Sequence, residues 1–146
     1  MRLGRVSRFV PYKQSTLVIR VLSYHGRCLK GFVTTPAQEW EIPFSNLMEL
    51  LLTVEQLLDE RQSPQQCMRP RIFDVPARWP PPRTSPCTGH GAVLATFTLR
   101  ILFRQNASWQ GSICWLERGV EAQFRSALEL IGLLDSALWG LTEKSP

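Results

Sequence analysis

Apolar residues recur at every second position in two distant stretches of this chain, which is typical of β-strands with one buried face. The stretches are residues 16–24 and 96–105. Their apolar faces consist of Leu17, Ile19 and Val21 in the first and of Phe97, Leu99, Ile101 and Phe103 in the second. A turn and a second strand follow each stretch, at residues 27–35 and 109–117. A short third strand is then expected over residues 39–44 and 120–124, so the pattern predicts two three-stranded groups.

Apolar residues at helical spacing follow each third strand. The stripes are Leu47, Leu50, Leu51, Val54, Leu57 and Leu58 in the first helix and Ala127, Leu130, Ile131, Leu134 and Leu138 in the second. Asn46 with Glu49, and Ser126 with Glu129, have the spacing of a capping box, in which the two side chains satisfy free backbone amides at a helix start. Gly140 is expected to end the second helix.

The two patterned stretches match each other at a constant spacing. Thr96–Leu138 lies 80 positions after Thr16–Leu58, and the alignment needs no gap. The identical pairs include Arg20/Arg100, Leu22/Leu102, Gly31/Gly111, Glu41/Glu121, Phe44/Phe124, Glu49/Glu129, Leu50/Leu130 and Leu58/Leu138. Because strand faces, caps and helix stripes also coincide, we predict an internal repeat.

A single β-β-β-α unit of about 45 residues buries too little surface to fold robustly alone. We therefore predict an α+β fold of two tandem β-β-β-α units in a pseudo-two-fold arrangement. Edge strands would join into one antiparallel sheet with both helices on one face; direct helix-to-helix packing is the alternative. The expected core consists of Leu17, Ile19, Val21, Leu29, Val33, Leu47, Leu50, Leu51, Val54 and Leu58, and of Phe97, Leu99, Ile101, Trp109, Ile113, Trp115, Phe124, Leu130, Ile131, Leu134 and Leu138.

Composition changes sharply between the two units. The expected segments are a basic N-terminal arm at 1–14, the first unit at 15–60, a Pro-rich linker at 61–94, the second unit at 95–141 and a tail at 142–146. The linker holds most of the chain's 11 Pro residues. Part of it is expected on the surface of a unit because it also carries Ile72, Phe73, Val75 and Trp79.

The net charge of +5 is distributed unevenly. Residues 1–38 hold seven basic residues and no acid, whereas residues 39–60 hold six acids and no base. A basic arm is compatible with an acidic or nucleic-acid partner and equally with an ordinary soluble basic protein. There is no apolar run long enough for a membrane span and no secretory h-region, so we expect a cytoplasmic protein with reduced cysteines and no membrane partner.

The predicted outward face of the sheet is polar and basic. Such faces bind single-stranded nucleic acid through phosphate contacts and base stacking, although any half-exposed sheet carries similar residues. The candidate binding residues on this face and in the adjoining turn are Arg20, Lys30, Arg100, Arg104, Asn106, Trp109 and Gln110.

Catalytic and metal-binding patterns are weak. His25 falls in a turn and His90 in the linker, so neither is placed as a general base on a rigid element. Cys67, Cys87 and His90 are metal-ligand types, but three ligands are one short of a closed site. We predict a non-enzymatic protein with no catalytic residue, no metal site and no cofactor.

One local string carries a resemblance. Residues Asn106–Gly111 (NASWQG), Phe124–Leu130 (FRSALEL) and Asp135–Leu138 (DSAL) resemble a segment of small uncharacterised proteins of anaerobic Firmicutes. The first unit resembles a diverged copy of the same segment. The resemblance implies a bacterial, cytoplasmic origin. It implies no activity and no site residue.

Two functions follow as hypotheses. The first is an accessory or regulatory protein that acts through protein–protein contacts. The alternative is a nucleic-acid-binding module that uses the basic sheet face and the N-terminal arm. The sequence leaves open the identity of any partner and the oligomeric state.

Overall fold

The computed structural model describes residues 16–37, 40–61, 64–66, 68–73, 85–86 and 92–142. The predicted N-terminal arm, most of the tail and the central part of the linker lie outside these residues, as do Cys67, Cys87 and His90. The elements in chain order are β1 (Thr16–His25), β2 (Cys28–Thr34), β3 (Trp40–Phe44), α2 (Leu47–Arg61), β4 (Ser85–Pro86), β5 (Ala95–Phe103), β6 (Gln110–Trp115), β7 (Val120–Phe124) and α3 (Ala127–Thr142).

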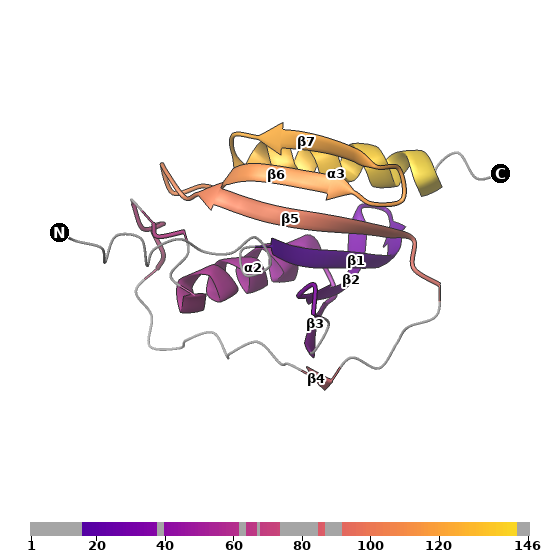
Figure 1. Cartoon of the computed structure of the whole chain (residues 1–146), viewed down its shortest axis with the longest axis horizontal. Coiled ribbons are helices and arrows are strands. Elements are labelled where there is room, and N and C mark those ends of the chain that lie inside the picture. Colours follow the sequence, from indigo (N-terminus) through magenta and orange to yellow (C-terminus); the bar gives the residue numbers. More distant parts are fainter. Residues whose placement is uncertain are drawn as a thin grey trace.

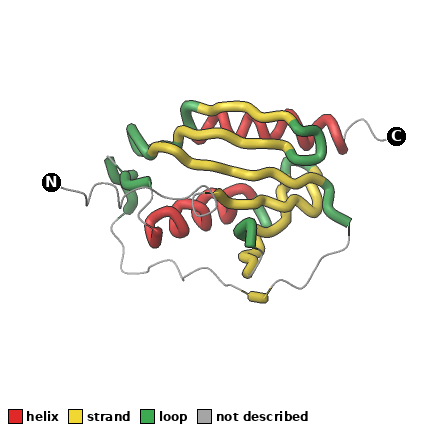
Figure 2. The backbone as a smooth tube through the Cα atoms, in the orientation of Figure 1, coloured by secondary structure: helices red, strands yellow, loops and turns green. Residues whose placement is uncertain are grey.

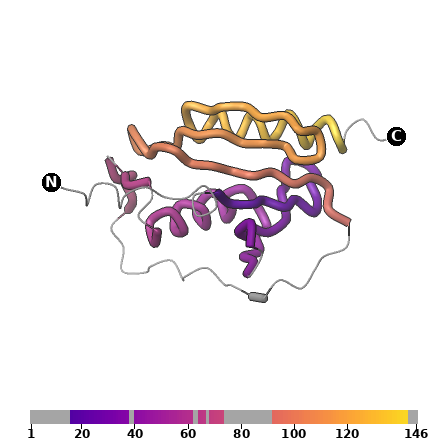
Figure 3. Tube along the Cα trace, in the orientation of Figure 1, coloured from indigo at the N-terminus to yellow at the C-terminus, as the bar shows by residue number. Residues whose placement is uncertain are grey.

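The strands form one antiparallel sheet in the order β4-β3-β2-β1-β5-β6-β7, so the fold is α+β (Figure 1). The two-residue strand β4 extends one edge, where it pairs with β3. Strands β1 and β5 meet in the middle of the sheet although they are far apart in sequence (Figure 3). Val18 lies opposite Thr98 in this central pair.

Each long hairpin contains a bulge that the alternating pattern does not reveal. The register shifts between Val21 and Ser23 in the β1–β2 pair and between Ile101 and Phe103 in the β5–β6 pair. An extra residue in one strand reverses the face of every residue beyond it. Phe103, expected on the apolar face of its strand, is therefore 56% exposed. Arg104, expected on the outward face, lies on the helix side, so both expectations were wrong.

Both helices begin at the predicted capping boxes. The Glu49 amide donates to Asn46 Oδ1 at 2.9 Å and the Glu129 amide donates to Ser126 Oγ at 3.2 Å. The two glutamates in turn accept from the amides of the residues before the caps, at 2.6 and 2.7 Å. Helix α3 continues to Thr142, so the expected end at Gly140 was wrong. Glycine lowers helix propensity without forbidding the helical conformation.

Both helices cover the same face of the sheet (Figures 1 and 2) and share one core with it. The predicted core residues are buried except Leu47, Leu51, Trp115 and Ile131, which are partly buried. The core residues that the prediction missed are Tyr24, Ile42, Phe44, Leu57 and Ala95. No helix in the described ranges combines the length and the apolar character needed to cross a bilayer.

The opposite face of β1, β2 and β3 is also buried in part. Val18 and Phe32 are each 5% exposed and Thr34 is fully buried. The expectation of an open polar face is therefore wrong for this half of the sheet. This outcome restricts the area on which nucleic acid could bind.

Candidate functional site

The tip of the β1–β2 hairpin contacts α3 through a polar cluster. The Tyr24 hydroxyl donates a hydrogen bond to Asp135 Oδ1. Arg27 donates to both oxygens of the same carboxylate, from Nε at 3.2 Å and from Nη2 at 3.3 Å. The guanidinium of Arg27 also lies 4.9 Å from the ring centroid of Trp139. This cluster fixes the hairpin on the helix.

The protonation states of this cluster follow from its contacts. Hydrogen bonds from Arg27 first and Tyr24 second lower the pKa of Asp135, because both stabilise the carboxylate. Burial, reinforced by the bond to Asp135, raises the pKa of Tyr24 to about 12. At neutral pH the cluster is therefore a phenol, a carboxylate and a guanidinium.

The tip of the β5–β6 hairpin contacts α2 in the same manner with different residues. Arg104 is only 3% exposed, and its Nη1 lies 2.7 Å from Asp59 Oδ1 and 3.4 Å from Glu55 Oε2. Trp109 Nε1 donates to Glu55 Oε1 at 2.8 Å. Arg104 Nε donates to the carbonyl oxygen of Pro64 at 2.7 Å, so the residues after α2 join this contact.

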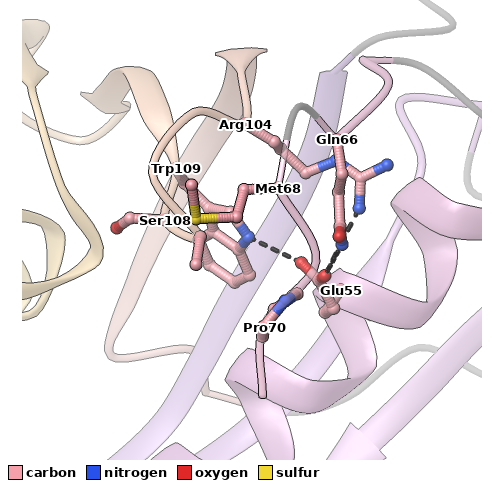
Figure 4. A pocket seen from close by; sticks show the side chains of 8 residues that line it. Glu55, Gln66, Met68, Pro70, Arg104, Ser108 and Trp109 are labelled. Carbon is pink, nitrogen blue, oxygen red and sulfur yellow. Dashed lines mark hydrogen bonds and ion pairs between the residues drawn. The ribbon is translucent and has the colours of Figure 1, made fainter.

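The space beside α2 is filled by the chain itself (Figure 4). We call it the α2 crevice, which is lined by Glu55, Gln66, Met68, Pro70, Arg104, Ala107, Ser108 and Trp109. Its remaining volume is only about 10 Å³. The Gln66 amide donates to the Glu55 carboxylate, and Gln66 forms an isolated parallel bridge with Arg104. Gln66, Met68 and Pro70 therefore occupy this crevice.

The space beside α3 is open. We call it the α3 groove, which is lined by Tyr24, Arg27, Leu29, Leu47, Leu128, Ile131, Gly132, Leu134, Asp135 and Leu138. Its volume is about 230 Å³ and its lining is mostly apolar, with the Arg27–Asp135 pair at the rim. Pockets for small molecules usually have volumes of roughly 300–1,000 Å³. The α3 groove therefore suits one or two side chains of a peptide better than a cofactor.

Groups with catalytic potential are scattered in the described part of the chain. His25 is exposed in the β1–β2 turn, and the free thiols of Cys28 and Cys114 lie on β2 and β6. A shallow polar hollow of about 300 Å³ is lined by Asp59, Gln65, Gln66, Arg69 and Arg104. The described residues contain no cluster of three His, Cys, Asp or Glu side chains that could hold a metal ion.

The seven predicted binding residues do not gather at one place. Arg20 and Arg100 are half-buried on the sheet face turned away from the helices, and Lys30 is exposed on β2. Asn106 occupies the β5–β6 turn with a positive φ of 57°, as its turn role requires. Gln110 exchanges hydrogen bonds with the Gln105 backbone at 3.0 and 3.1 Å.

Arg104 and Trp109 lie on the other side of the sheet, against α2. Sequence reasoning missed their acidic partners Glu55 and Asp59, and it also missed the cluster around Asp135. A signal was present, because Asp135 stands 80 positions after Glu55 and Arg104 stands 80 positions after Tyr24. These offsets equal the repeat spacing and mark positions with the same contact role.

Comparison of the chain with protein-family models, curated proteins and solved structures found no match. The resemblance to proteins of anaerobic Firmicutes therefore stays a prediction, and the geometry alone carries the functional argument.

Proposed function

We propose that this protein is a non-enzymatic accessory or regulatory protein that binds an extended apolar segment of a protein partner in the α3 groove. One observation carries the proposal: an open apolar volume of about 230 Å³ beside α3, where the corresponding space beside α2 is filled. Leu128 at its border is 76% exposed and extends the apolar surface of the groove. The bacterial, cytoplasmic setting expected from the sequence belongs to the same proposal.

The proposal includes two tandem β-β-β-α units in a pseudo-two-fold arrangement. A two-fold axis between the units would give each strand pair a counterpart 80 positions away. The pair Thr16–Arg100 has the counterpart Thr96–Arg20, and both pairs occur in the sheet. Both hairpins shift register at corresponding residues. These correspondences support treating the α3 groove and the α2 crevice as equivalent places.

The equivalent places differ in two ways that explain why only one is open. Trp109 fills the α2 crevice, whereas the corresponding residue of the α3 groove is the smaller Leu29. Gln66, Met68 and Pro70 also lie in the α2 crevice, whereas the described residues leave the α3 groove unfilled. The α2 crevice is thus filled by a segment of the chain itself, which supports a peptide segment as the ligand of the equivalent α3 groove.

The experiment is selection of peptides from a phage-displayed random library on the purified full chain. We expect enrichment of peptides with apolar side chains that bind the wild type and Met48→Glu but do not bind Gly132→Trp. Gly132 lines the α3 groove, and a Cβ added there meets no atom within 4 Å, so a large side chain fills the groove without entering the core.

Met48→Glu is the control for a substitution outside the groove, because Met48 is 69% exposed on α2 and does not line the groove. Thermal unfolding of each variant verifies that it is folded. A lack of enrichment, or selected peptides that bind Gly132→Trp as tightly as the wild type, would contradict the proposal.

Nucleic-acid binding, the alternative, has less support from the geometry. Phosphate contacts need accessible cations. Arg104 is buried in ion pairs with two acids, and Arg20 and Arg100 are half-buried. Of the four cations among the candidate residues, Lys30 is the one that is exposed.

A further inference from the structure

We propose that a segment of the same molecule, residues 71–73, closes over the α3 groove and thereby regulates the binding of a partner peptide. We call this segment, Arg71-Ile72-Phe73, the strap. The inference rests on the proposed function, because it assigns a regulator to the same groove. In the open state, described above, the described residues leave the groove unfilled and the strap is exposed. In the closed state, Ile72 packs on Leu128 and Phe73 enters the groove beside Gly132.

The apolar side chains of the strap are unusually exposed. Ile72 is 82% exposed and Phe73 is 91% exposed, the two largest exposures among the large apolar side chains described. Residues 71–73 belong to neither helix nor strand, so their movement breaks no regular secondary structure. Transfer of apolar side chains from water into an apolar groove is favourable, and this transfer provides the driving force for closure.

The strap begins beside one end of the α3 groove. Pro70, directly before the strap, lines the α2 crevice together with Ser108 (Figure 4). Ser108 Oγ accepts a hydrogen bond of 2.8 Å from the amide of Ala127, the first residue of α3. Leu128, the next residue of this helix, lines the α3 groove. The start of the strap is therefore held near the Leu128 end of the groove.

The strap is also long enough to reach the middle of the groove. An extended chain advances roughly 3.3–3.6 Å per residue, so Phe73 can lie about 10 Å beyond Pro70. A helix rises about 1.5 Å per residue, so Gly132 lies about 7.5 Å along α3 from Ala127. A Cβ added to Gly132 meets no atom within 4 Å, so the groove has room for the Phe73 ring there.

The residues just before the strap already close the equivalent place beside α2. Gln66, Met68 and Pro70 line the α2 crevice, whose remaining volume is about 10 Å³. Gln66 donates there to the carboxylate of Glu55, which stands 80 positions before Asp135 of the α3 groove. Closure of the strap would therefore continue, along the same stretch of chain, from one equivalent place to the other.

The groove and the strap match in size and in chemistry. The groove volume of about 230 Å³ suits one or two side chains, and its lining is mostly apolar. Because the strap is tethered beside the groove, closure is an intramolecular step with a high effective concentration. The entropy lost on ordering three residues opposes the burial of two side chains, so we expect both states to be populated. A partner peptide then has to displace the strap.

The first experiment measures the affinity of the selected peptides for Phe73→Ser. A closed strap lowers the apparent affinity in proportion to the open fraction, so loss of the strap contact raises it. We expect a closed fraction of about two-thirds or more, and Phe73→Ser should therefore bind the peptides about threefold or more tightly than the wild type. Phe103→Ser is the matched control, because Phe103 is 56% exposed and does not line the groove. Its affinity should equal that of the wild type.

The second experiment measures tryptic cleavage after Arg71 in the full chain, by mass spectrometry at early times. Closure protects this bond, and the cleavage rate follows the open population when the strap moves faster than trypsin cuts. Gly132→Trp, which fills the groove, should be cut there faster than the wild type, by the same factor that Phe73→Ser gains in affinity. Phe103→Ser should be cut at the wild-type rate.

The outcomes separate the strap from the proposed function. Equal peptide affinities of the wild type and Phe73→Ser, or equal cleavage rates of the wild type and Gly132→Trp, would overturn the strap. Selected peptides that bind the wild type and not Gly132→Trp would then leave the proposed function standing. A lack of enriched peptides contradicts the proposed function, whereas the tryptic assay needs no peptide and still decides whether the strap closes.

Discussion

Asp135 accepts hydrogen bonds from two residues that are more than a hundred positions away in the sequence, Tyr24 and Arg27. The carboxylate is stabilised by both donors, and the phenol is held protonated by burial and by the carboxylate beside it. Arg104 forms ion pairs with Glu55 and Asp59 on the other helix, and it also donates a hydrogen bond to Asp59. At the scale of single residues, Arg27 and Arg104 thus each join a hairpin tip to a helix.

Tyr24 makes the stability of the protein depend on alkaline pH. The folded-state pKa of about 12 lies above the value of about 10 for an unfolded chain. The stabilisation is therefore complete below about pH 10 and is lost as the pH rises toward 12. Tyr24→Phe should lower the free energy of unfolding by about 1 kcal/mol at neutral pH, the usual net value of one hydrogen bond.

Urea denaturation at several pH values measures this effect. The difference between the wild type and Tyr24→Phe should shrink above about pH 10, because the variant has no phenol to titrate at that position. The chain has two tyrosines, so the absorbance titration of Tyr24→Phe reports Tyr12 alone and gives Tyr24 by subtraction. A Tyr24 midpoint at or below about 10 would refute the assignment.

The bulged hairpins depend on one glycine each. A Cβ built on Gly31 would lie 2.0 Å from the Arg20 carbonyl oxygen, and a Cβ on Gly111 would lie 2.0 Å from that of Arg100. The clashing atoms belong to the backbone of the neighbouring strand, so they cannot move aside as a side chain would. The glycines therefore allow the two strands of each hairpin to approach closely beside the bulge.

Gly31→Ala and Gly111→Ala should each destabilise the protein by about 3 kcal/mol or more, at the upper end of the cost of overpacking. Chemical denaturation of both variants measures this. Gly140→Ala is the control, because a Cβ there meets no atom within 4 Å and Ala is favoured in a helix by about 1 kcal/mol. Similar small effects at all three positions would show that the hairpins tolerate a wider separation.

At the scale of elements, the sequence predicted the six main strands, both helices and both capping boxes. Alternation and helical spacing are local signals, and the Asn46–Glu49 and Ser126–Glu129 pairs act over one helical turn. The bulges could not be predicted, because the apolar pattern at these positions fits both a regular strand and a strand with one extra residue. Leu102 and Phe103 are both apolar and both exposed. The predicted alternation of faces therefore continued beyond the bulge, where the side chains actually change sides of the sheet.

At the scale of the whole molecule, the two halves are interlocked. β1 pairs with β5 in the middle of the sheet, and each hairpin tip is bound to the helix of the other half, through Asp135 and through Glu55. The repeat spacing made it possible to predict two halves that share one sheet. The exchange of helix contacts could not be predicted, because it depends on which faces the bulges turn toward the helices.

This interlocking predicts that neither half folds alone. Fragments 15–73 and 92–146 should each lack a cooperative thermal transition by circular dichroism, since each loses the central strand pair and the packing of its hairpin tip. An equimolar mixture should regain helical and strand signal by association of the two fragments. A cooperative transition in either fragment by itself would show that one unit buries enough surface without the other.

The two edges of the sheet differ in what they offer to a further strand. The β3 edge is covered by β4, which brings Pro86 opposite Trp40, and proline has no amide hydrogen to donate. The β7 edge has no described strand beyond it, and Val120 there is 56% exposed. Its length of five residues and the exposed Glu121 oppose templated growth by backbone pairing. The short β7 edge thus carries, in its length and in Glu121, a safeguard against uncontrolled aggregation.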